Sequence, residues 1–190
     1  MKKFILISIF IAFFSCNKVD LPKPNVIIIY ADDLGYGDVS SYGLGTLQTP
    51  NIDKIANDGI RFTNGYASSA TCSPSRYALM TGTYPWRNKN AKILTGANLI
   101  IDTTEMTLPK MFKSMGYQTG IVGKWHLGLG DGPVNHNEFI SPGPNEVGFD
   151  HSFIMADTQD RVPTVYIENG YVVNLAVSYT HLRAHETLPY

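Results

Sequence analysis

The sequence predicts an α/β fold built around a mainly parallel central sheet. The first observation is an apolar, β-branched run at residues 25–30, whose composition is that of a strand buried on both faces. The second is a further core strand at residues 117–123. Between them lie helical segments at residues 50–58 and 73–82, each with start and stop signals. Buried strands that alternate with helices are typical of a parallel sheet.

Length and composition agree with a globular protein. The chain has 190 residues, of which 44% are hydrophobic and 16% are charged, and its formal net charge is −1. This is enough for one domain or for part of a larger one. Because the chain has no basic patch and no run of like charges, nothing in it favours nucleic acid or an anionic membrane surface as a partner.

Residues 1–15 are predicted to be a secretory signal peptide. A short basic region precedes the apolar residues 4–14, a stretch too short to span a bilayer. The small Ser15 before Cys16 resembles a bacterial lipobox, so we expect lipidation of Cys16 and a linker at residues 16–24. The alternative is ordinary cleavage that leaves Cys16 as a thiol. Either way the protein is expected to be exported, to the periplasm or as an outer-membrane-anchored lipoprotein.

Two adjacent aspartates, Asp32 and Asp33, follow the strand at residues 25–30. In open α/β sheets, ligands bind at the carboxyl ends of the strands. Paired carboxylates at that place, followed by conformationally permissive glycines, predict a site for a hard cation. The alternative for an isolated Asp–Asp pair is a structural role, in which one of the aspartates only caps a turn. The position at the end of the strand favours the metal.

The next segment, residues 49–67, connects the aspartates to Cys72. Residues 50–58 are predicted to form a short helix, with Thr49 as N-cap and Gly59 as the stop signal. The alternating residues 60–67 then predict a strand that runs toward Cys72. The expected buried face of the helix consists of Ile52, Ile55 and Ala56.

Cys72 begins the segment that we expect to form the centre of the functional site. Pro74 suits the first turn of a helix over residues 73–82. Arg76 lies four residues after Cys72, about one helical turn away, so its guanidinium can reach over the cysteine. A reactive group at a helix N-terminus beside a permanent cation is suited to anionic chemistry. No disulfide between Cys16 and Cys72 is expected, because each cysteine has another expected role. Cys16 belongs to the lipobox-like signal, and Cys72 belongs to the segment just described.

A second strand end carries Lys124 and His126. Thr107 caps a predicted helix at residues 108–115, and the core strand at residues 117–123 follows it. Alternation along an extended chain would place Lys124 and His126 on one face. A lysine and an imidazole at a strand end suit contact with an anion and proton transfer. Taken alone, such a pair is more often a surface lysine and a hydrogen-bonded histidine.

The remaining residues carry weaker signals. Residues 84–104 and 131–149 are predicted to be loops. The Asn169–Gly170 pair within residues 165–173 predicts a β-hairpin with a type I′ turn. Candidate substrate contacts, each more often a solvated loop residue, are His136, Asn137, Glu138, His151 and residues 157–161.

The last residues are expected to be foreign to the protein. From about Val177 the sequence resembles the conceptual translation of a transposase sequencing adaptor. We therefore treat residues 177–190 as a non-native tail, and we assign no chemistry to His181 or His185. The alternative is a genuine polar tail.

The motif Cys72-Ser73-Pro74-Ser75-Arg76, followed by Leu79, Thr81 and Gly82, resembles that of the type I, arylsulfatase-like sulfatase family. Residues 25–33, the cysteine motif and residues 120–128 occur in the order of that family. One departure is Thr83, where many members have arginine. The resemblance implies an alkaline-phosphatase-like α/β sandwich, with residues 25–176 as the N-terminal part of the catalytic domain.

The resemblance also implies the chemistry of position 72. The Cys-x-Pro-x-Arg core is the signal by which a formylglycine-generating or anaerobic sulfatase-maturing enzyme converts the cysteine to formylglycine (3-oxoalanine), here from Cys72. In the family, one hydroxyl of the hydrated aldehyde attacks the sulfur of the ester and the alcohol leaves. The second hydroxyl then expels sulfate and regenerates the aldehyde.

Roles for the other candidate residues follow from the same resemblance. Asp32 and Asp33 would bind Ca²⁺ together with the modified residue 72. Arg76 would hold the hydrate. The residues that would contact the modified residue, the sulfate or the leaving oxygen are Lys124 and His126.

The implied function is hydrolysis of sulfate esters, with a sulfated glycan or a simpler ester as substrate. Family members are longer, and their later part supplies further metal ligands and catalytic residues, so we expect the chain as written to be inactive and unstable. One alternative is a phosphonate or phosphate monoester hydrolase of the same superfamily. Another is a non-catalytic glycan-binding pseudoenzyme, which requires that Cys72 stays unmodified.

Overall fold

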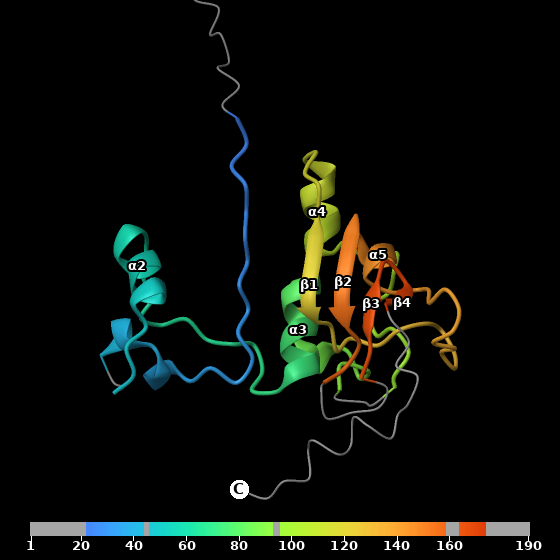
Figure 1. Ribbon diagram of the computed structural model, residues 1–190, viewed down its shortest axis with the longest axis horizontal. Coiled ribbons are helices and arrows are strands. Elements are labelled where there is room, and N and C mark those ends of the chain that lie inside the picture. The colour runs from blue at the N-terminus through green and yellow to red at the C-terminus, as the bar shows by residue number, and fades with distance from the viewer. Residues whose placement is uncertain (1–21, 44–45, 93–95, 159–163, 174–190) are drawn as a thin grey trace, which may run out of the picture.

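The computed structural model describes residues 22–43, 46–92, 96–158 and 164–173. They form a four-stranded sheet with two helices beside β1, and an N-terminal part that stands apart from the sheet (Figure 1). The expected signal peptide, Cys16 and the expected foreign tail lie outside the described residues. In the described part of the chain, no helix is both long enough and apolar enough to cross a bilayer.

The sheet has the order β1–β2–β3–β4 and is mixed. β1 (Gly120–Lys124) runs parallel to β2 (His151–Met155), in a register that pairs Lys124 with Met155. β3 (Tyr166–Glu168) is antiparallel to β2 and to β4 (Tyr171–Val173). The α/β class predicted from the sequence is confirmed, with one parallel and two antiparallel pairings among the described strands.

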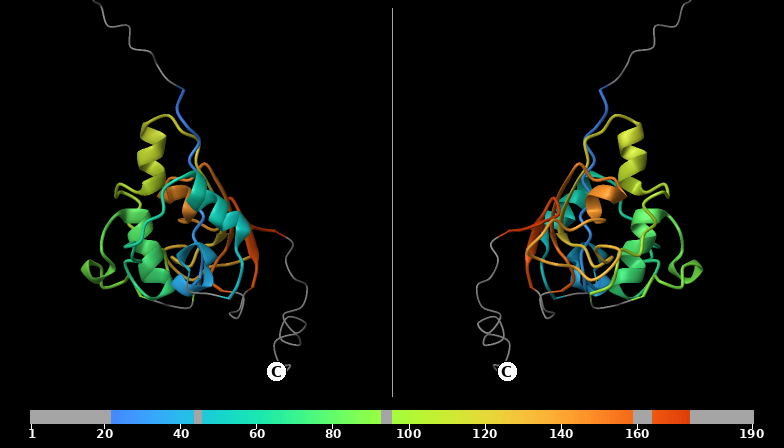
Figure 2. Two further views of the ribbon diagram at one scale, coloured as in Figure 1. Left: turned by 90° about the vertical axis from the view of Figure 1, so that its left-hand side faces the viewer. Right: turned by 90° about the vertical axis from the view of Figure 1, so that its right-hand side faces the viewer.

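The helices begin and end close to where their signals predict. α3 (Cys72–Thr81) is closed by Gly82 in the left-handed conformation, with φ of 66°. α4 (Leu108–Ser114) is capped by the side chain of Thr107, which accepts a hydrogen bond from the Lys110 amide. Both lie beside β1, one beyond the other (Figures 1 and 2). The other helical elements are α2 (Pro50–Asp58), α5 (Pro144–Val147) and the 3₁₀ turns η1 (Tyr36–Asp38), η2 (Ser40–Tyr42) and η3 (Pro85–Arg87).

The hydrophobic core lies between the sheet, α3 and the loops that follow them. Trp125 and Leu127, just beyond β1, are 1% exposed, and Ile154 at the centre of β2 is fully buried. The remaining core residues are Tyr77, Ala91, Ile101, Leu129, Ile140, Val147, Phe149, Val165 and Ile167. All of these residues follow position 71, so the residues before α3 contribute almost nothing to the core.

The predicted strand at residues 25–30 is not formed. The segment is extended, but residues 22–31 pair with no described strand, and Ile27 and Ile29 are 84% and 82% exposed. A cavity of about 400 Å³ separates this segment from β1, and Val26 and Ile28 line it on one side. An apolar run becomes a strand only where a neighbour accepts its backbone hydrogen bonds. Here no described strand lies close enough to accept the hydrogen bonds of this run.

Two other expectations for the N-terminal part are wrong for the same reason. Residues 60–67 contain a turn and are exposed along their length instead of forming a strand. α2 forms as predicted, but its expected buried face is open, with Ile52 43% and Ile55 66% exposed. Both segments have the residue pattern for burial, yet the described residues leave their large apolar side chains exposed.

The C-terminal hairpin is confirmed, and two elements were missed. Asn169 and Gly170 have φ of 46° and 84°, as a type I′ turn between β3 and β4 requires. β2 and α5 were not predicted, since α5 lies within the predicted loop at residues 131–149 and His151, the first residue of β2, was expected in a loop. β2 is short and begins with the polar His151 and Ser152, so its sequence alone carries little strand signal.

Candidate active site

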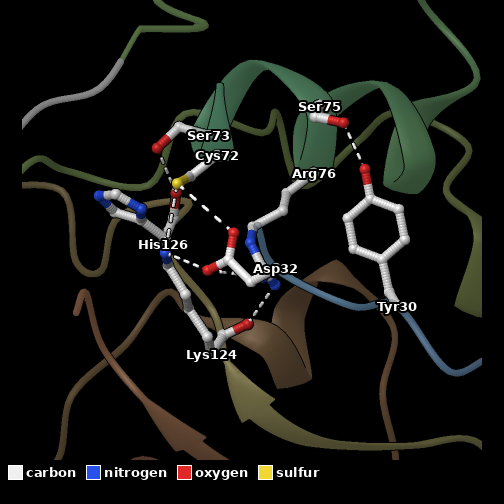
Figure 3. A network of polar contacts seen from close by, with 8 residues as sticks. All are labelled: Tyr30, Asp32, Cys72, Ser73, Ser75, Arg76, Lys124 and His126. Carbon is white, nitrogen blue, oxygen red and sulfur yellow. Dashed lines mark hydrogen bonds and ion pairs between the residues drawn. The ribbon is translucent and has the colours of Figure 1, made fainter. Parts of the chain in front are cut away.

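The N-terminus of α3 places Cys72. Thr71 is the extended N-cap residue and Cys72 is the first residue of the helix. Pro74 lies in the first turn, where an amide hydrogen would have no acceptor within the helix, so its absence breaks no hydrogen bond. The hydroxyl of Ser73, which is 2% exposed, donates to the carbonyl oxygen of His126 at 2.7 Å. This bond fastens the first turn of α3 to the residues that follow β1, so the cysteine faces the end of β1 (Figure 3).

Lys124, the last residue of β1, reaches the cysteine. Its Nζ lies 3.2 Å from the Sγ of Cys72 and 2.5 Å from the Oδ2 of Asp32. The backbone beneath it is fixed, because β1 pairs with β2 and the amide of Trp125 donates to the carbonyl of Met155 at 2.9 Å. An ammonium group held beside residue 72 is suited to bind an anion at that point.

Asp32 connects the N-terminal segment to this site. Its Oδ1 accepts from the Sγ of Cys72 at 3.7 Å, while its Oδ2 is paired with Lys124 and lies 3.6 Å from Nη2 of Arg76. The hydrogen bond from Lys124 is the main reason that the pKa of this carboxyl lies below its usual value, with further contributions from the charges of Lys124 and Arg76. Asp32 is therefore a carboxylate at neutral pH.

Arg76 lies behind Asp32 rather than over the cysteine. Its Nη1 donates to the carbonyl oxygen of Lys124 at 2.6 Å, and its Nη2 faces Asp32. The sequence predicted a direct reach to Cys72, one helical turn away. In the structure the two side chains meet the same aspartate instead, and Figure 3 shows all four groups converging from α3, β1 and the N-terminal segment.

His126 is buried beside the same helix end, and its backbone is unusual. It is 2% exposed and has φ of 54°, a left-handed conformation that costs on the order of 1–2 kcal/mol in a residue with a side chain. Its amide donates to the carbonyl of Ala156 at 2.8 Å, and its carbonyl accepts from Ser73. Because β1 ends at Lys124, the alternation that the sequence argument used does not extend to His126.

The chain beyond His126 is held by a second segment. The amides of Ile100 and Leu129 donate to the carbonyls of Leu127 and Ala97, both at 3.0 Å. Gly128 has φ of 81°, and a Cβ atom there would lie 2.0 Å from the carbonyl oxygen of Asn98. Only glycine fits so close an approach. Residues 97–100 therefore fix the turn that follows the candidate catalytic residues.

Asp33 does not join the cluster. It adopts a left-handed conformation with φ of 59°, is exposed, and makes no hydrogen bond or ion pair with any described residue. The described residues contain no group of three or more His, Cys, Asp and Glu side chains that could hold a metal ion. Of the predicted calcium ligands, only Asp32 and residue 72 lie together.

The weaker candidates lie elsewhere or make local contacts. His151 pairs with Gly120 at the opposite end of β1 from Lys124, about 13 Å along the strand, and its Nδ1 is 3.2 Å from the side-chain nitrogen of Asn169. Among the described residues, Asn137 bonds only to Asn135, within the turn that begins there. Burial lowers the pKa of His136, an effect that the nearby charge of Asp157 opposes. Residues 159–161 are outside the described part of the chain.

The residues that sequence reasoning missed are Ser73, Ser75 and Tyr30. Ser73 and Ser75 occupy variable positions of the cysteine motif, and the structure buries both. Tyr30 ends the apolar run before the aspartates, where it looked like one more strand residue. A hydroxyl-bearing aromatic at the end of an apolar run was the available signal.

Comparison with known proteins identifies the family. A family model described as sulfatase matches residues 24–181. The chain belongs to the sulfatase family. Its resemblance to type I sulfatases, first recognised in the Cys72 motif, is thereby confirmed, and the fold of the described residues fits an alkaline-phosphatase-like α/β architecture.

Two sulfatases illustrate the similarity in sequence. An N-acetylgalactosamine-6-O-sulfatase of Bacteroides thetaiotaomicron is 52% identical over 173 residues, which cover 87% of this chain and 34% of that protein. Human steryl-sulfatase is 43% identical over 114 residues, which cover 56% of this chain and 20% of that protein. The chain thus spans about a third or less of the length of these relatives.

Solved structures extend the likeness to the fold. One, from work on the metabolism of multiple glycosaminoglycans by Bacteroides thetaiotaomicron, has a TM-score of 0.78 at 53% identity, over 81% of this chain and 32% of that chain. Another, Ps i-CgsB in complex with k-i-k-neocarrahexaose, has a TM-score of 0.66 at 32% identity, over 87% of this chain and 40% of that chain. The architecture around Cys72 is therefore that of a sulfatase.

Proposed function

We propose that the whole protein to which this chain belongs hydrolyses sulfate esters through a formylglycine made from Cys72. The observation that carries the proposal is the position of Cys72 at the N-terminus of α3, with Lys124 Nζ 3.2 Å from its sulfur and Asp32 beside it. In a sulfatase, the residue at this point must receive an anionic group. A fixed ammonium group and a helix N-terminus both favour that.

The chemistry at position 72 requires modification of the cysteine. The hydrated aldehyde supplies one hydroxyl that takes the sulfuryl group as the bond from sulfur to the ester oxygen breaks, and a second hydroxyl whose deprotonation releases sulfate. A thiol or a serine hydroxyl has no second hydroxyl, so either would stop after the first transfer. The maturation enzyme that recognises the Cys-x-Pro-x-Arg core, of either the formylglycine-generating or the anaerobic class, is accordingly a proposed partner.

The residues of this chain would bind and orient the reacting groups. Lys124 is placed to contact a sulfate oxygen or the leaving oxygen, because its Nζ already lies against the side chain of residue 72. Arg76 and Lys124 keep Asp32 ionised, which lets that carboxylate accept a hydrogen bond from residue 72. His126 lines the same end of β1 from a buried position and is the proposed proton carrier for the departing alcohol.

Calcium is proposed for the whole protein, but the described residues do not make a calcium site by themselves. Ca²⁺ takes about six to eight oxygen ligands, and only Asp32 and residue 72 meet here, with Asp33 pointing to no described partner. The remaining ligands would come from the rest of a longer protein. We therefore propose that the 190-residue chain alone is inactive.

The proposed substrate is a sulfated glycan. Its support is the similarity to an N-acetylgalactosamine-6-O-sulfatase and to structures from work on glycosaminoglycan metabolism and with a bound neocarrahexaose. Export fits such a substrate. We therefore also propose that residues 1–15 direct secretion and that Cys16 carries a lipid anchor, which would place the enzyme in the periplasm or at the outer membrane.

Turnover by the whole protein, produced together with a maturation enzyme, tests the function. We expect release of sulfate from 6-sulfated N-acetylgalactosamine at a rate about a thousand-fold or more above that of the Cys72→Ala variant. Faster turnover of phosphate or phosphonate monoesters than of sulfate esters would favour the phosphatase-like alternative. Glycan binding without turnover, by a protein whose Cys72 stays a thiol, would favour a pseudoenzyme and overturn the proposal.

A further inference from the structure

Tyr30 packs against the catalytic helix from outside the core. It precedes Asp32 by two residues, and its hydroxyl is hydrogen-bonded to the hydroxyl of Ser75 on α3. The ring lies beneath the guanidinium of Arg76, whose central carbon is 5.6 Å from the ring centre. Figure 3 shows the phenol turned toward α3, at the side of Arg76 away from Cys72.

Arg76 has few other restraints. One terminal nitrogen donates to the Lys124 carbonyl at 2.6 Å and the other lies 3.6 Å from Asp32, beyond a normal hydrogen bond. Its Nε is buried and has no hydrogen-bond partner among the described residues. The hydrogen bonds alone therefore leave the plane of the guanidinium free to rotate about the contact with Lys124. The aromatic ring supplies the missing constraint.

The contact has the chemistry to orient a guanidinium. Arginine stacks on aromatic faces, and the attraction grows where the group is removed from water. Arg76 has 13% of its side chain exposed, so it is largely desolvated here. The ring in turn is fixed at its far end by Ser75, which is 6% exposed and belongs to the same helical turn as Arg76. Tyr30 thus touches two successive residues of α3.

We propose that Tyr30 is a positioning residue, which holds Arg76 in the orientation that lets it face Asp32 beside residue 72. In this arrangement the ring of Tyr30 fixes the plane of the Arg76 guanidinium. The hydrogen bond between the hydroxyls of Tyr30 and Ser75 fixes the orientation of the ring. The kinetic consequence rests on the proposed function, because it concerns hydrolysis at residue 72. The structural consequence, an ordered Arg76, does not depend on the reaction.

A simple packing role makes a different prediction. Tyr30 is 41% exposed, and an anchor for the N-terminal segment would need only apolar bulk. Leucine supplies such bulk without a π face, whereas phenylalanine keeps the face and loses the hydroxyl. Tyr30→Leu and Tyr30→Phe therefore separate orientation of Arg76 from packing. Tyr66→Leu is the matched control, because Tyr66 lines the same hollow as Tyr30 but makes no contact with Arg76.

The kinetic test uses the whole, matured protein. We expect Tyr30→Leu to lower kcat by roughly ten- to thirty-fold with KM within about two-fold, the size of a lost cation–π contact at a desolvated site. Tyr30→Phe should restore most of this, leaving a loss of about two- to four-fold. Ser75→Ala should match Tyr30→Phe, and the double variant should add nothing, since both remove one hydrogen bond. Tyr66→Leu should match the parent.

A readout independent of activity follows the Arg76 side chain itself. In protein labelled with ¹⁵N-arginine, the Nε–H signal of Arg76, assigned by its loss in Arg76→Lys, should show an ordered side chain in the parent and in Tyr30→Phe. It should show fast motion in Tyr30→Leu. Equal order in Tyr30→Leu and the parent would overturn the proposal, as would equal kinetic losses for Leu and Phe. If Arg76 loses order but the parent turns over no sulfate ester, the positioning role stands and the proposed function fails.

Discussion

Two regions of the molecule supply the candidate site, and they are built differently. The region from residue 72 to 173 contains the sheet, α3, α4 and nearly all of the buried hydrophobic side chains. The region from residue 22 to 71 contributes Asp32, yet Val39 is the only buried hydrophobic residue among those described there. Figure 1 shows this N-terminal region extending away from the sheet.

The difference shows what fixes each catalytic candidate. Lys124 is held by the strand that carries it, because the β1–β2 ladder and the buried Trp125 fix its backbone. Asp32 has no such ladder, and its position depends on its own polar contacts with Lys124, Arg76 and Cys72 and on the contacts of nearby Tyr30 with α3. One half of the site is thus positioned by the core, and the other half by contacts of single side chains, most of them charged.

The largest expected contrast is in amide hydrogen exchange of the 190-residue chain. The amides of residues 26–30 face no acceptor in the described structure, whereas residues 153–155 of β2 lie between two paired strands, β1 and β3. We expect exchange at residues 26–30 to be at least about a thousand-fold faster than at Phe153 and Ile154. Equal protection in both regions would show that the N-terminal run is paired after all. We predict that the instability expected from the sequence is confined to the region before α3.

A matched pair of core-type substitutions sharpens the same contrast. Ile154→Ala removes a fully buried side chain from β2 and should lower the free energy of unfolding by about 3 kcal/mol. Ile29→Ala removes the same atoms from a side chain that is 82% exposed, so it should change the free energy of unfolding by less than about 0.5 kcal/mol. Urea unfolding of both variants measures the difference. Comparable losses would mean that Ile29 is packed in solution.

Titration tests the charge-held half of the site. Lys124 holds the pKa of Asp32 below its usual value, so the stabilisation that Asp32 contributes is complete above the unfolded-state pKa, about 3.9. That contribution is lost as the pH falls through the lower folded-state pKa. Lys124→Met should raise the pKa of Asp32, as followed by the NMR shift of its carboxyl carbon. Lys113→Met is the control, since Lys113 likewise lowers the pKa of Asp150 and should leave Asp32 unchanged. An unmoved Asp32 in Lys124→Met would contradict the account.

The smallest effect is expected at an ion pair that belongs to neither half of the site. Lys54 and Asp58 on α2 are 2.5 Å apart, and their side chains are 73% and 63% exposed. Exposed pairs of this kind contribute little, so Lys54→Ala should change the free energy of unfolding by about 0.3 kcal/mol. Thermal unfolding checks this. A loss above about 1 kcal/mol would show that α2 is better packed than its exposed isoleucines indicate.

Local signals in the sequence located the elements that carry the chemistry. The Pro74 and Gly82 signals fixed α3, and Asn169–Gly170 fixed the hairpin, because both depend on the conformations of a few consecutive residues. The end of β1 was predicted to within one residue, from the apolar run that precedes Lys124. The sequence placed Asp32 and Lys124 at the ends of two strands, and the structure brings both to Cys72, although only the strand that ends at Lys124 is formed.

Contacts between distant segments could not be predicted in this way. The run at residues 25–30 has the composition of a strand, but a strand also needs a neighbour, which no local pattern specifies. β2 was missed because Ser152 is polar yet fully buried, and its amide is satisfied by the side chain of Asn169, which lies in another element. The contact of Tyr30 with Arg76 joins residues far apart in the chain, and the tyrosine at the end of the apolar run did not by itself identify Arg76 as its partner.

The most direct test of the central claim is the mass of the peptide that contains Cys72, from the whole protein produced in a host with a maturation enzyme. Conversion of the thiol to the aldehyde lowers the peptide mass by about 18 Da. We predict this loss in the parent protein and its absence when Cys72 is replaced by alanine. A parent peptide that keeps its full thiol mass would contradict the claim that Cys72 is the precursor of the catalytic group.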